Sequence, residues 1–517
     1  MARRLPHGSR LVALLASLAL LLLAGCGSSG SATSGSPGPD PATVAPASAS
    51  VYVQAIVRPS GDMKAGVLAA ARKVARIADP GAALRRALDS DRSGGVVFSR
   101  DVEPWLGRRV GVFVLLDAAR LRHPDFAVVA AIADRGAFDA AHARILKHDM
   151  HPAGSYRGIA YAQEGSDRTA YAAPVGDVFV IGTLAGLRAA IDAEHGANLA
   201  ADARFKDAVA GVPTDALAFA YADPRAIVAA LAGGTGPASA TARRALAQVG
   251  RSGPLVASLS ASADQIAIEA SGDAQLLSAL NASTSTPLSA GQLPGDAWLA
   301  LATPPLGPAI RRVLDSAGVH GLAAAQVRRR TGLDLDKDLL DPLGGLALFV
   351  RGESPLDIGV GVLLQMTDAA AARLLTTRLE AIVAGGLHLA PRPLSLSDAR
   401  GFQVDVPQLP QPIVVLARGD KLAAGYATAS ALDLLAPRQR LDASPTGKAA
   451  IATLGDGYTP SLVLVVPPLV ALLRSLDGLQ VTHLSAVVPY LEAYRSLALG
   501  TKRDGNRVSV RLVAALR

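Results

Sequence analysis

The sequence predicts an α+β fold, arranged as two tandem copies of a mainly antiparallel sheet covered by helices. Strand-like runs alternate with Ala-rich helical stretches only in part, and several strand-like runs follow one another across short turns. Adjacent runs of this kind form hairpins, which favours an antiparallel sheet over a doubly wound parallel one. The same order of segments recurs in the second half of the chain, and such self-similarity indicates a duplicated unit.

The composition is that of a folded chain with more than one domain. Of the 517 residues, 50% are apolar and 18% are charged, which excludes a wholly disordered protein. The single cysteine excludes disulfide frameworks and Cys-ligated metal sites. The formal net charge of +8 comes from scattered basic residues, so we expect no nucleic-acid partner.

Residues 1–25 have the pattern of a lipoprotein signal peptide. An Arg-containing segment precedes the apolar run Leu11–Leu23. At about 1.5 Å per residue this run spans roughly 20 Å, which is short of the ~30 Å hydrocarbon core of a bilayer. A secretory signal is therefore favoured over a permanent transmembrane helix.

The end of this segment resembles the lipobox of bacterial lipoproteins. Leu23, Ala24 and Gly25 precede Cys26, which is the only cysteine of the chain. The resemblance implies that the Cys26 thiol receives a diacylglyceryl group and that cleavage makes Cys26 the new N-terminus. Because two or more acyl chains such as palmitate anchor a protein stably, we expect a lipid anchor in the cell membrane, on its extracytoplasmic face. The alternative is an unmodified cysteine in an ordinary signal peptide.

Residues 26–50 are predicted to comprise the lipidated cysteine and a flexible tether. After Cys26 the residues are small, polar or Pro, apart from one Val and one Asp. A Gly/Ser-type coil of this length would reach about 25–29 Å, and its prolines would stiffen it. The tether would hold the folded body off the bilayer.

The first repeat is assigned to residues 51–280. Runs predicted as strands are Val51–Val57, Val110–Leu116, Phe126–Ala133, Ala216–Ala222 and the hairpin of Leu255–Ser260 with Gln265–Ala270. Segments predicted as helices are Met63–Ile77, Ala137–Leu146 and Leu184–Ala193.

A linker at residues 281–294 leads to the second repeat, residues 295–517. Its predicted strands are Ala297–Leu301, Leu346–Val350, Ile358–Met366, Leu462–Val466 and the hairpin of Ser496–Leu499 with Arg507–Val513. Its predicted helices include Ala309–Arg330 and Ala369–Ile382. In the last hairpin, Asp504-Gly505 is the dipeptide suited to a type I′ turn, in which both central residues need a positive φ.

Short motifs recur at matching places in the two repeats. The pairs are Arg157-Gly158 with Arg400-Gly401, Gly176-Asp177 with Gly419-Asp420, Gly182 with Gly425, and Glu103-Pro104-Trp105-Leu106-Gly107 with Asp341-Pro342-Leu343-Gly344-Gly345. The last match places Leu343 opposite Trp105. We interpret Trp105 and Trp298, which both lie in this shared framework, as core residues.

The strong catalytic motifs are absent from the sequence. It contains no HExxH, no GxSxG and no complete phosphate-binding loop, since Ser444–Lys448 lacks both the first Gly and the Ser or Thr after the Lys. We therefore predict no enzyme activity, no metal and no cofactor. An active site assembled only by folding would escape such a search.

Two clusters have a partial resemblance to metal sites. Asp334, Asp336 and Asp338 have the spacing of an EF-hand loop but lack its Gly and bidentate Glu, so a solvated turn is favoured. His142, His148 and His151 lie near a predicted helix end, and only a bent chain could bring them to one metal ion.

Gly359-Val360-Gly361 is a fragment of a dinucleotide-binding motif. It lies inside a strand-like run, where glycines more often permit close packing.

Two segments of the chain resemble a known family. Val51–Gly61 (VYVQAIVRPSG) and Asp101–Gly107 (DVEPWLG) are similar to actinobacterial envelope proteins whose domain is catalogued as domain of unknown function 3352. The resemblance runs over most of residues 51–517. That family has no assigned activity, so the resemblance implies a fold and no reaction.

Together these features predict a membrane-tethered lipoprotein that binds an envelope partner, either protein or lipid, without catalysis. One alternative is a carrier of a lipid or other apolar ligand, and a weaker one is a solute-binding protein that serves a transporter. A filled core would favour the binding or scaffold role. An apolar cavity of roughly several hundred Å³ would favour the carrier, and a polar cleft would favour the solute-binding protein.

Overall fold

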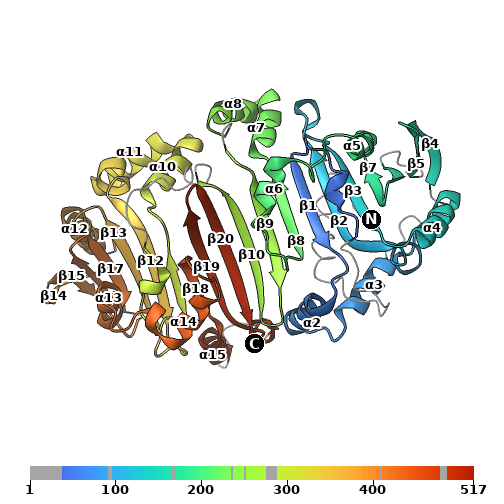
Figure 1. Cartoon of the computed structure of the whole chain (residues 1–517). Coiled ribbons are helices and arrows are strands. Elements are labelled where there is room, and N and C mark those ends of the chain that lie inside the picture. Colours follow the sequence, from blue (N-terminus) through green and yellow to red (C-terminus); the bar gives the residue numbers. More distant parts are fainter. Residues whose placement is uncertain are drawn as a thin grey trace, which may run out of the picture. The chain divides into compact units, whose positions relative to one another are not determined.

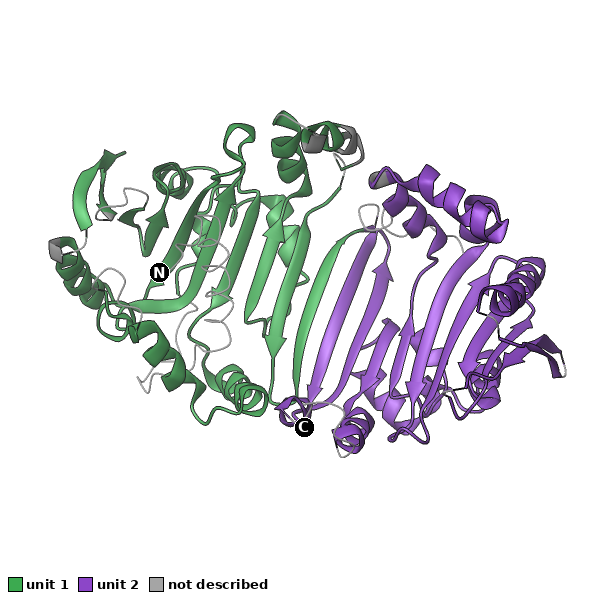
Figure 2. Ribbon diagram, turned by 180° about the vertical axis from the view of Figure 1, so that it is seen from behind, with its two compact units in different colours: residues 1–273 green, residues 274–517 purple. Residues whose placement is uncertain are grey.

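The computed structural model describes residues 38–90, 96–148, 150–164, 170–234, 237–249, 252–274, 288–387, 389–396, 398–407, 409–477 and 486–517. The chain divides into two compact units, residues 1–273 and 274–517 (Figure 2). Each unit consists of an antiparallel sheet with helices packed against it, as the sequence predicts.

The sheet of the first unit is antiparallel at every described pairing. Its strands are β1 (Val51–Ile56), β2 (Leu106–Leu115), β3 (Asp125–Ile132), β4 (Met150–Tyr156), β5 (Ile159–Glu164), β6 (Tyr171–Val175), β7 (Val178–Gly182), β8 (Ala218–Ala222), β9 (Leu255–Ala261) and β10 (Gln265–Asp273). Their order across the sheet is β4-β5-β6-β7-β3-β2-β1-β8-β9-β10.

The second unit repeats this order strand for strand. Its strands are β11 (Leu299–Ala302), β12 (Leu343–Arg351), β13 (Gly359–Met366), β14 (Arg392–Leu396), β15 (Ala399–Val404), β16 (Ile413–Arg418), β17 (Lys421–Tyr426), β18 (Thr459–Val465), β19 (Tyr494–Asp504) and β20 (Arg507–Leu516). They lie in the order β14-β15-β16-β17-β13-β12-β11-β18-β19-β20. The duplication that the sequence predicts is therefore a duplication of topology.

The helices also recur in matching places (Figure 1). The first unit has α2 (Gly61–Ala75), α3 (Pro80–Ser90), α4 (Arg135–His148), α5 (Leu184–Glu194), α6 (Ala203–Val209), α7 (Pro224–Gly233) and α8 (Pro237–Val249). The second has α10 (Gly307–Ser316), α11 (His320–Thr331), α12 (Ala369–Gly386), α13 (Thr428–Leu435), α14 (Pro445–Ala452), α15 (Val466–Asp477) and α16 (Val488–Leu491). Short 3-10 segments are η1 (Pro41–Thr43), η3 (Ala118–Arg120), η4 (Ala290–Gln292) and η6 (Leu441–Ala443), and π-helical turns are η2 (Phe98–Val102) and η5 (Leu335–Leu340).

The registers confirm two of the sequence matches. Gly182 pairs with Ala127 of β3, and Gly425 pairs with Gly361 of β13. Gly182 is the last residue of β7, and Gly425 is the last but one of the equivalent strand β17. Gly176 and Gly419 stand in the turns β6–β7 and β16–β17 with φ of 55° and 57°. This left-handed region is open to glycine at little cost, which explains why the residue recurs there.

Two other matches are wrong by a few residues. Arg157-Gly158 forms the β4–β5 turn, with φ of 49° and 82°, whereas Arg400 and Gly401 lie inside β15. Leu343 pairs with Met366 in the second unit, and Leu106 pairs with Ile132 in the first, so Leu343 is the equivalent of Leu106. The residue before it, Pro342, is therefore the equivalent of Trp105. Identity of two or three residues does not fix an alignment when turn lengths differ between the repeats.

The last hairpin is confirmed, but its turn is displaced by one residue. Asp504 pairs with Arg507, so the central residues are Gly505 and Asn506. Among the described residues Gly505 has a positive φ, of 54°, and Asn506 does not. A type I′ turn needs a positive φ at both central residues, so the φ of Asn506 excludes the predicted type I′ turn, and a glycine at the first central position is typical of a type II′ turn.

The predicted tether extends too far into the body. Asp40 caps η1 by accepting a hydrogen bond from the backbone N–H of Ala42, and Val44, Ala45 and Ala49 are buried in the core of the first unit. Part of the predicted linker is equally well packed, since Ala290 and Leu293 are buried in the second unit. Segments rich in Ala, Pro and Ser look like tethers by composition, yet their small side chains also fit tight cores.

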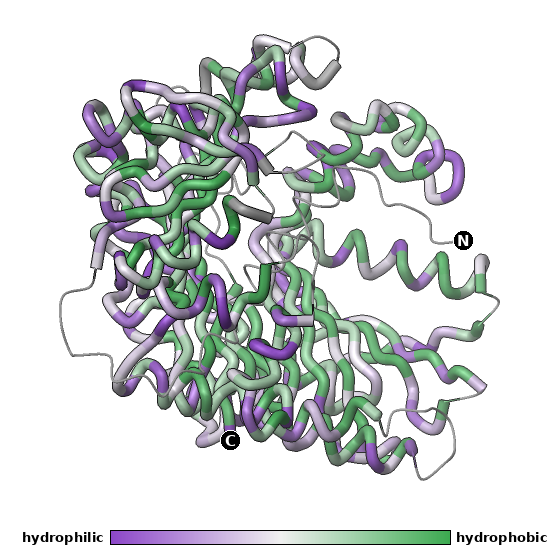
Figure 3. The backbone as a smooth tube through the Cα atoms, turned by 90° about the vertical axis from the view of Figure 1, so that its right-hand side faces the viewer, coloured by the Kyte–Doolittle hydropathy of each residue, from purple (hydrophilic) through white to green (hydrophobic). Residues whose placement is uncertain are grey.

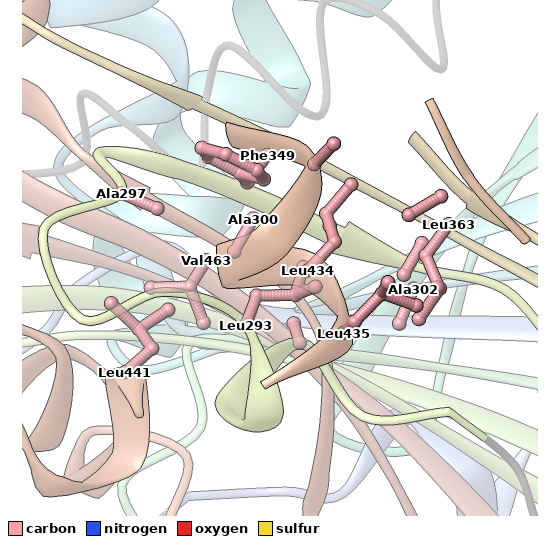
Figure 4. Packing of buried hydrophobic residues seen from close by; sticks show 14 of the residues in the cluster. Leu293, Ala297, Ala300, Ala302, Phe349, Leu363, Leu434, Leu435, Leu441 and Val463 are labelled. Carbon is pink, nitrogen blue, oxygen red and sulfur yellow. The ribbon is translucent and has the colours of Figure 1, made fainter. Parts of the chain in front are cut away.

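Apolar side chains fill both cores. In the first unit Tyr52, Phe113, Leu187 and Ile191 belong to a buried cluster between the sheet and α5. In the second unit Phe349, Ala300 and Val463 of neighbouring strands pack with Leu434 of α13 and Leu441 of η6 (Figure 4). The chain trace coloured by hydropathy shows hydrophobic residues along most of its length (Figure 3).

We expect Gly182→Ala to destabilise the first unit. A Cβ at this position would lie 2.6 Å from the Cα of Ala127, so β7 and β3 would have to separate. Overpacking of this kind costs typically about 1–3 kcal/mol, and the urea midpoint of unfolding should fall accordingly. The control is Gly211→Ala, where a Cβ meets nothing within 4 Å. Equal midpoints for the two variants would contradict the close approach.

Candidate functional site

The predicted lipidation site lies outside the described residues. Leu23, Ala24, Gly25 and Cys26 all precede residue 38, where the described chain begins. Lipidation therefore stays a prediction. The described residues contain no helix with the length and hydrophobicity needed to cross a membrane.

The best-defined polar cluster lies in the second unit, where α10, α11 and η5 meet. Asp336 accepts hydrogen bonds from Nε of Arg311, at 2.8 Å, and is 3.0 Å from Nε2 of His320. The other ring nitrogen of His320, Nδ1, is 2.6 Å from a carboxylate oxygen of Asp315. The Nη2 group of Arg311 donates a hydrogen bond to a carboxylate oxygen of Asp341 at 2.6 Å. We call these five side chains the His320 cluster.

The chain folds this way because α10 ends in a tight reversal. Gly318 has φ of 68°. The N–H of Val319 donates to the backbone carbonyl of Leu314, and the N–H of Gly318 donates to the backbone carbonyl of Asp315. This is the Schellman arrangement, in which a glycine takes the left-handed position after the helix. The next helix starts at His320, which therefore returns to lie beside Asp315.

The electrostatics of the cluster favour a protonated histidine. The hydrogen bond with Asp315 is the largest cause that raises the pKa of His320, and the charge of Asp336 adds to it. The hydrogen bond from Arg311 lowers the pKa of Asp336. The cluster can thus hold three segments together through charge, and the raised pKa of His320 favours its protonated form.

The three aspartates that resemble an EF-hand have other roles. Asp334 accepts backbone hydrogen bonds from Asp336 and Lys337 at the start of η5, and Asp338 accepts the N–H of Asp334 at 2.8 Å. Asp336 is engaged by Arg311 and His320. Within the described part of the chain, no group of three or more His, Cys, Asp or Glu is arranged to hold a metal ion. The turn interpretation agrees with this geometry.

The first unit has a related cluster around η2. Asp101, only 2% exposed, accepts the N–H of Val97 at 2.9 Å, as Asp338 accepts that of Asp334. The hydrogen bond from Arg100 is the main cause that lowers the pKa of Asp101 to about 2, and Arg144 of α4 also donates to it. This cluster of the first unit contains no histidine. The imidazole of His320 therefore has no counterpart in it.

Both tryptophans are core residues, as predicted. Trp105 donates from Nε1 to the carbonyl of Asp101 at 2.6 Å and packs edge to face against Phe138 and Phe179. Trp298 is buried and donates from Nε1 to the carbonyl of Gly352 at 2.8 Å. Neither indole is available as a binding platform.

His142, Gly361 and Ser444 from the remaining motifs have structural roles too. His142 stacks on Phe138, with ring centroids 5.2 Å apart, and its burial lowers its pKa, whereas His151 lies exposed on β4. Gly361 lies in β13, where a Cβ would come within 2.7 Å of a Leu434 side-chain carbon. The hydroxyl of Ser444 caps α14 by accepting the N–H of Gly447 at 3.2 Å. That N–H is therefore occupied and does not face a phosphate.

Two hollows open on the surface of the described chain. The larger, of about 440 Å³, lies in the second unit and is lined by Leu396, Asp398, Ala399, Arg418, Leu432, Leu435 and Ala436. The ion pair of Arg418 with Asp398, at 2.7 Å, borders its apolar side chains. The smaller, of about 150 Å³, lies in the first unit beside Gln54 and Arg109.

This chain belongs to the family described as "Protein of unknown function (DUF3352)", whose sequence model matches residues 9–512. The match confirms the domain family that the sequence resembles, and its description assigns no activity, source or cellular location. The curated proteins include none that matches.

Among solved structures, crystal forms IV and I of TP0453 are similar at low level. Form IV is 14% identical, covers 48% of this chain and 87% of the other, and has a TM-score of 0.25. Form I is 11% identical, covers 48% and 81%, and has a TM-score of 0.26. TM-scores at this level establish neither a shared fold nor a shared function.

We predict that His320 stabilises the second unit most strongly at acidic pH. Because its folded pKa is raised, its contribution is complete below the unfolded pKa of about 6.5 and is lost as pH rises through the folded pKa. Urea unfolding of the wild type and of His320→Gln should differ more at about pH 5.5 than at about pH 8.5. The exposed His123→Gln is the control. A difference that grows with rising pH would contradict the assignment.

We also expect Asp101→Asn to lower the free energy of unfolding by about 1–3 kcal/mol, because a buried carboxylate loses charge-assisted hydrogen bonds. Asp338→Asn, at the equivalent and more exposed position, should cost less. Urea denaturation at neutral pH measures both. A larger loss for the Asp338 variant would refute this ranking.

Proposed function

We propose that this chain is a lipid-tethered lipoprotein of the bacterial cell envelope, held on the extracytoplasmic face of the membrane. Its duplicated body serves as a non-enzymatic binding or scaffold protein. The observation that carries the proposal is the position of the only cysteine, Cys26, directly after Leu23, Ala24 and Gly25 and behind an apolar run. The family match is compatible with this role and does not specify it.

The described residues limit the length of the proposed tether. Since Asp40 already belongs to the folded body, a tether from the lipidated residue would comprise at most residues 27–39. From Cys26 to Asp40 a fully extended chain spans at most about 50 Å, and a flexible coil of this length about 20 Å. The point where the body begins would thus stay within about 50 Å of the bilayer surface.

The filled cores support a binding or scaffold role for the body. Side chains such as Phe113 and Leu187 in the first unit, and Phe349 and Leu416 in the second, are fully buried between sheet and helices. A protein whose interior is occupied by its own side chains acts through its surface. The absence of catalysis rests on the sequence motifs alone.

One observation favours a carrier as the second candidate. The hollow of about 440 Å³ in the second unit has the size of a small-molecule site, and Leu396, Leu432 and Leu435 give it an apolar lining. Its opening to solvent and the bordering Arg418–Asp398 pair fit a small amphiphile better than a fully enclosed acyl chain.

We predict that Cys26→Ser releases the protein from the membrane. In the native host the wild type should fractionate with membranes and incorporate labelled palmitate, because its acyl chains are attached through Cys26. The variant should incorporate none and lose its membrane attachment through lipid. Ser28→Ala, two residues further on, is the matched control and should behave as the wild type. Equal palmitate labelling of the Cys26 variant would overturn the proposal.

A further inference from the structure

Two basic side chains of the hairpin formed by β19 and β20 lie against one aromatic ring. The strands pair side by side in the sheet of the second unit, with Lys502 opposite Ser509 (Figure 1). Arg511 is opposite Gly500, and since opposite residues of an antiparallel pair project from the same face, Lys502, Ser509 and Arg511 share one face. The ring of Tyr458 is 5.8 Å from Nζ of Lys502 and 6.0 Å from Cζ of Arg511. We call Tyr458, Lys502, Ser509 and Arg511 the Arg511 cluster.

Backbone carbonyls hold the two cations in place. Nζ of Lys502 donates to the carbonyl of Asp456 at 3.2 Å. Nη1 of Arg511 donates to the carbonyl of Leu454, also at 3.2 Å. Both carbonyls belong to the segment between α14 and β18, where Gly457 has φ of 80° and a Cβ on it would lie 3.2 Å from Cε of Lys502. The glycine therefore lets the lysine lie along this segment, and the fold itself positions both cations.

The two cations have no carboxylate partner. Among the described residues, neither Lys502 nor Arg511 forms an ion pair, and Nε of Arg511 is buried without a hydrogen-bond partner. Buried donors are almost always satisfied, so this group calls for an acceptor that the chain itself does not supply. The acidic residues on the same segments, Asp456 and Asp504, are exposed, and Asp504 is opposite Arg507 at the turn. The guanidinium and the ammonium group therefore remain available to an anion.

The first unit has no equivalent of this cluster. We followed the registers strand by strand from the matched strands β7 and β17 to the last hairpin of each unit. Ser260 of β9 occupies the position of Lys502. Glu269 of β10 occupies the position of Arg511, where its charge would repel an anion. The basic cluster is therefore specific to the second unit and does not follow from the shared fold.

We infer that the Arg511 cluster binds a phosphate group. The planar guanidinium of Arg511 presents N–H donors in a fork that matches two phosphate oxygens, and the ammonium group of Lys502 adds a second charged donor. The half-buried hydroxyl of Ser509, on the same face, supplies a donor for a further oxygen. The ring of Tyr458 supports both cations through cation–π contacts. More donors meet here than the two oxygens of a carboxylate would use.

A phosphate group fits a protein that acts through its surface. The inference deepens the proposed function by naming the chemistry that the body recognises, and it rests on that proposal because the envelope is the source of the phosphate. Phospholipid headgroups and phosphate in solution share this chemistry. Neither needs an interior cavity, which agrees with the filled core of the second unit.

The test uses the chain from residue 27 onward, which keeps every described residue. Calorimetric titration with sodium phosphate, in a buffer free of other oxyanions, should give saturable binding of one phosphate per chain. Arg511→Gln should weaken this binding at least about tenfold, because a charge-assisted hydrogen bond contributes about that factor. The matched control is Arg503→Gln, the same change on the opposite face of β19, which should bind phosphate as the wild type does.

A second variant separates phosphate binding from misfolding. Lys502→Ser introduces the residue that the first unit has at this position, and it should also weaken phosphate binding with an unchanged circular dichroism spectrum. The inference would be overturned by a wild type without saturable binding, by either cluster variant keeping the full affinity, or by acetate binding as tightly as phosphate.

Vesicles distinguish the two sources of the phosphate group. Phosphatidylcholine vesicles with about 30% phosphatidylglycerol are mixed with the same chain and sedimented. Cosedimentation that Arg511→Gln abolishes and free phosphate competes away assigns the site to a lipid headgroup. Binding of sodium phosphate without cosedimentation assigns it to phosphate in solution. Because Cys26 is absent from this chain, these outcomes are independent of the palmitate experiment.

Discussion

In each unit, one helix lies so close to the centre of the sheet that glycine and alanine are required at the contact. A Cβ on Gly425 would come within 2.5 Å of the backbone nitrogen of Ala431 in α13, and one on Gly361 within 2.7 Å of Leu434. The same relation holds in the first unit, where a Cβ on Gly186 of α5 would come within 2.2 Å of the carbonyl oxygen of Phe126 in β3. This close approach allows Leu and Phe side chains to fill the interior, so the remaining arrangement of strands and helices follows from it in both units.

Local patterns were enough to predict much of the fold. Alternating apolar runs predicted β1, β8 and β20. The recurring Gly-Asp turn before Gly182 and Gly425 identified the duplication, because a positive φ favours glycine and the residue therefore recurs at that turn. The packed segment at residues 40–50 was missed, since Ala and Pro are equally common in tethers and in tight cores. The His320 cluster was missed as well, because Asp315, His320 and Asp336 come together only through the Gly318 reversal and the π-helical turn.

The structure disfavours one of the competing functions, the transporter-linked solute-binding protein. Antiparallel sheets with filled interiors differ from the parallel lobes and polar cleft expected of a transporter-linked solute binder. The polar cluster of the second unit contains a histidine, His320, where the related cluster of the first unit has none. The two copies thus share a framework and have diverged at the surface, which is where a binding or scaffold protein would be expected to specialise.

Native mass spectrometry of the mature protein, purified from its own kind of host and followed by lipid extraction, tests most directly whether the body acts through its surface. The account predicts the mass of the chain with its covalent anchor and no further lipid bound in a fixed ratio. A non-covalent lipid released at near one per chain would contradict it and would favour the carrier, for which the hollow of about 440 Å³ in the second unit is the candidate site.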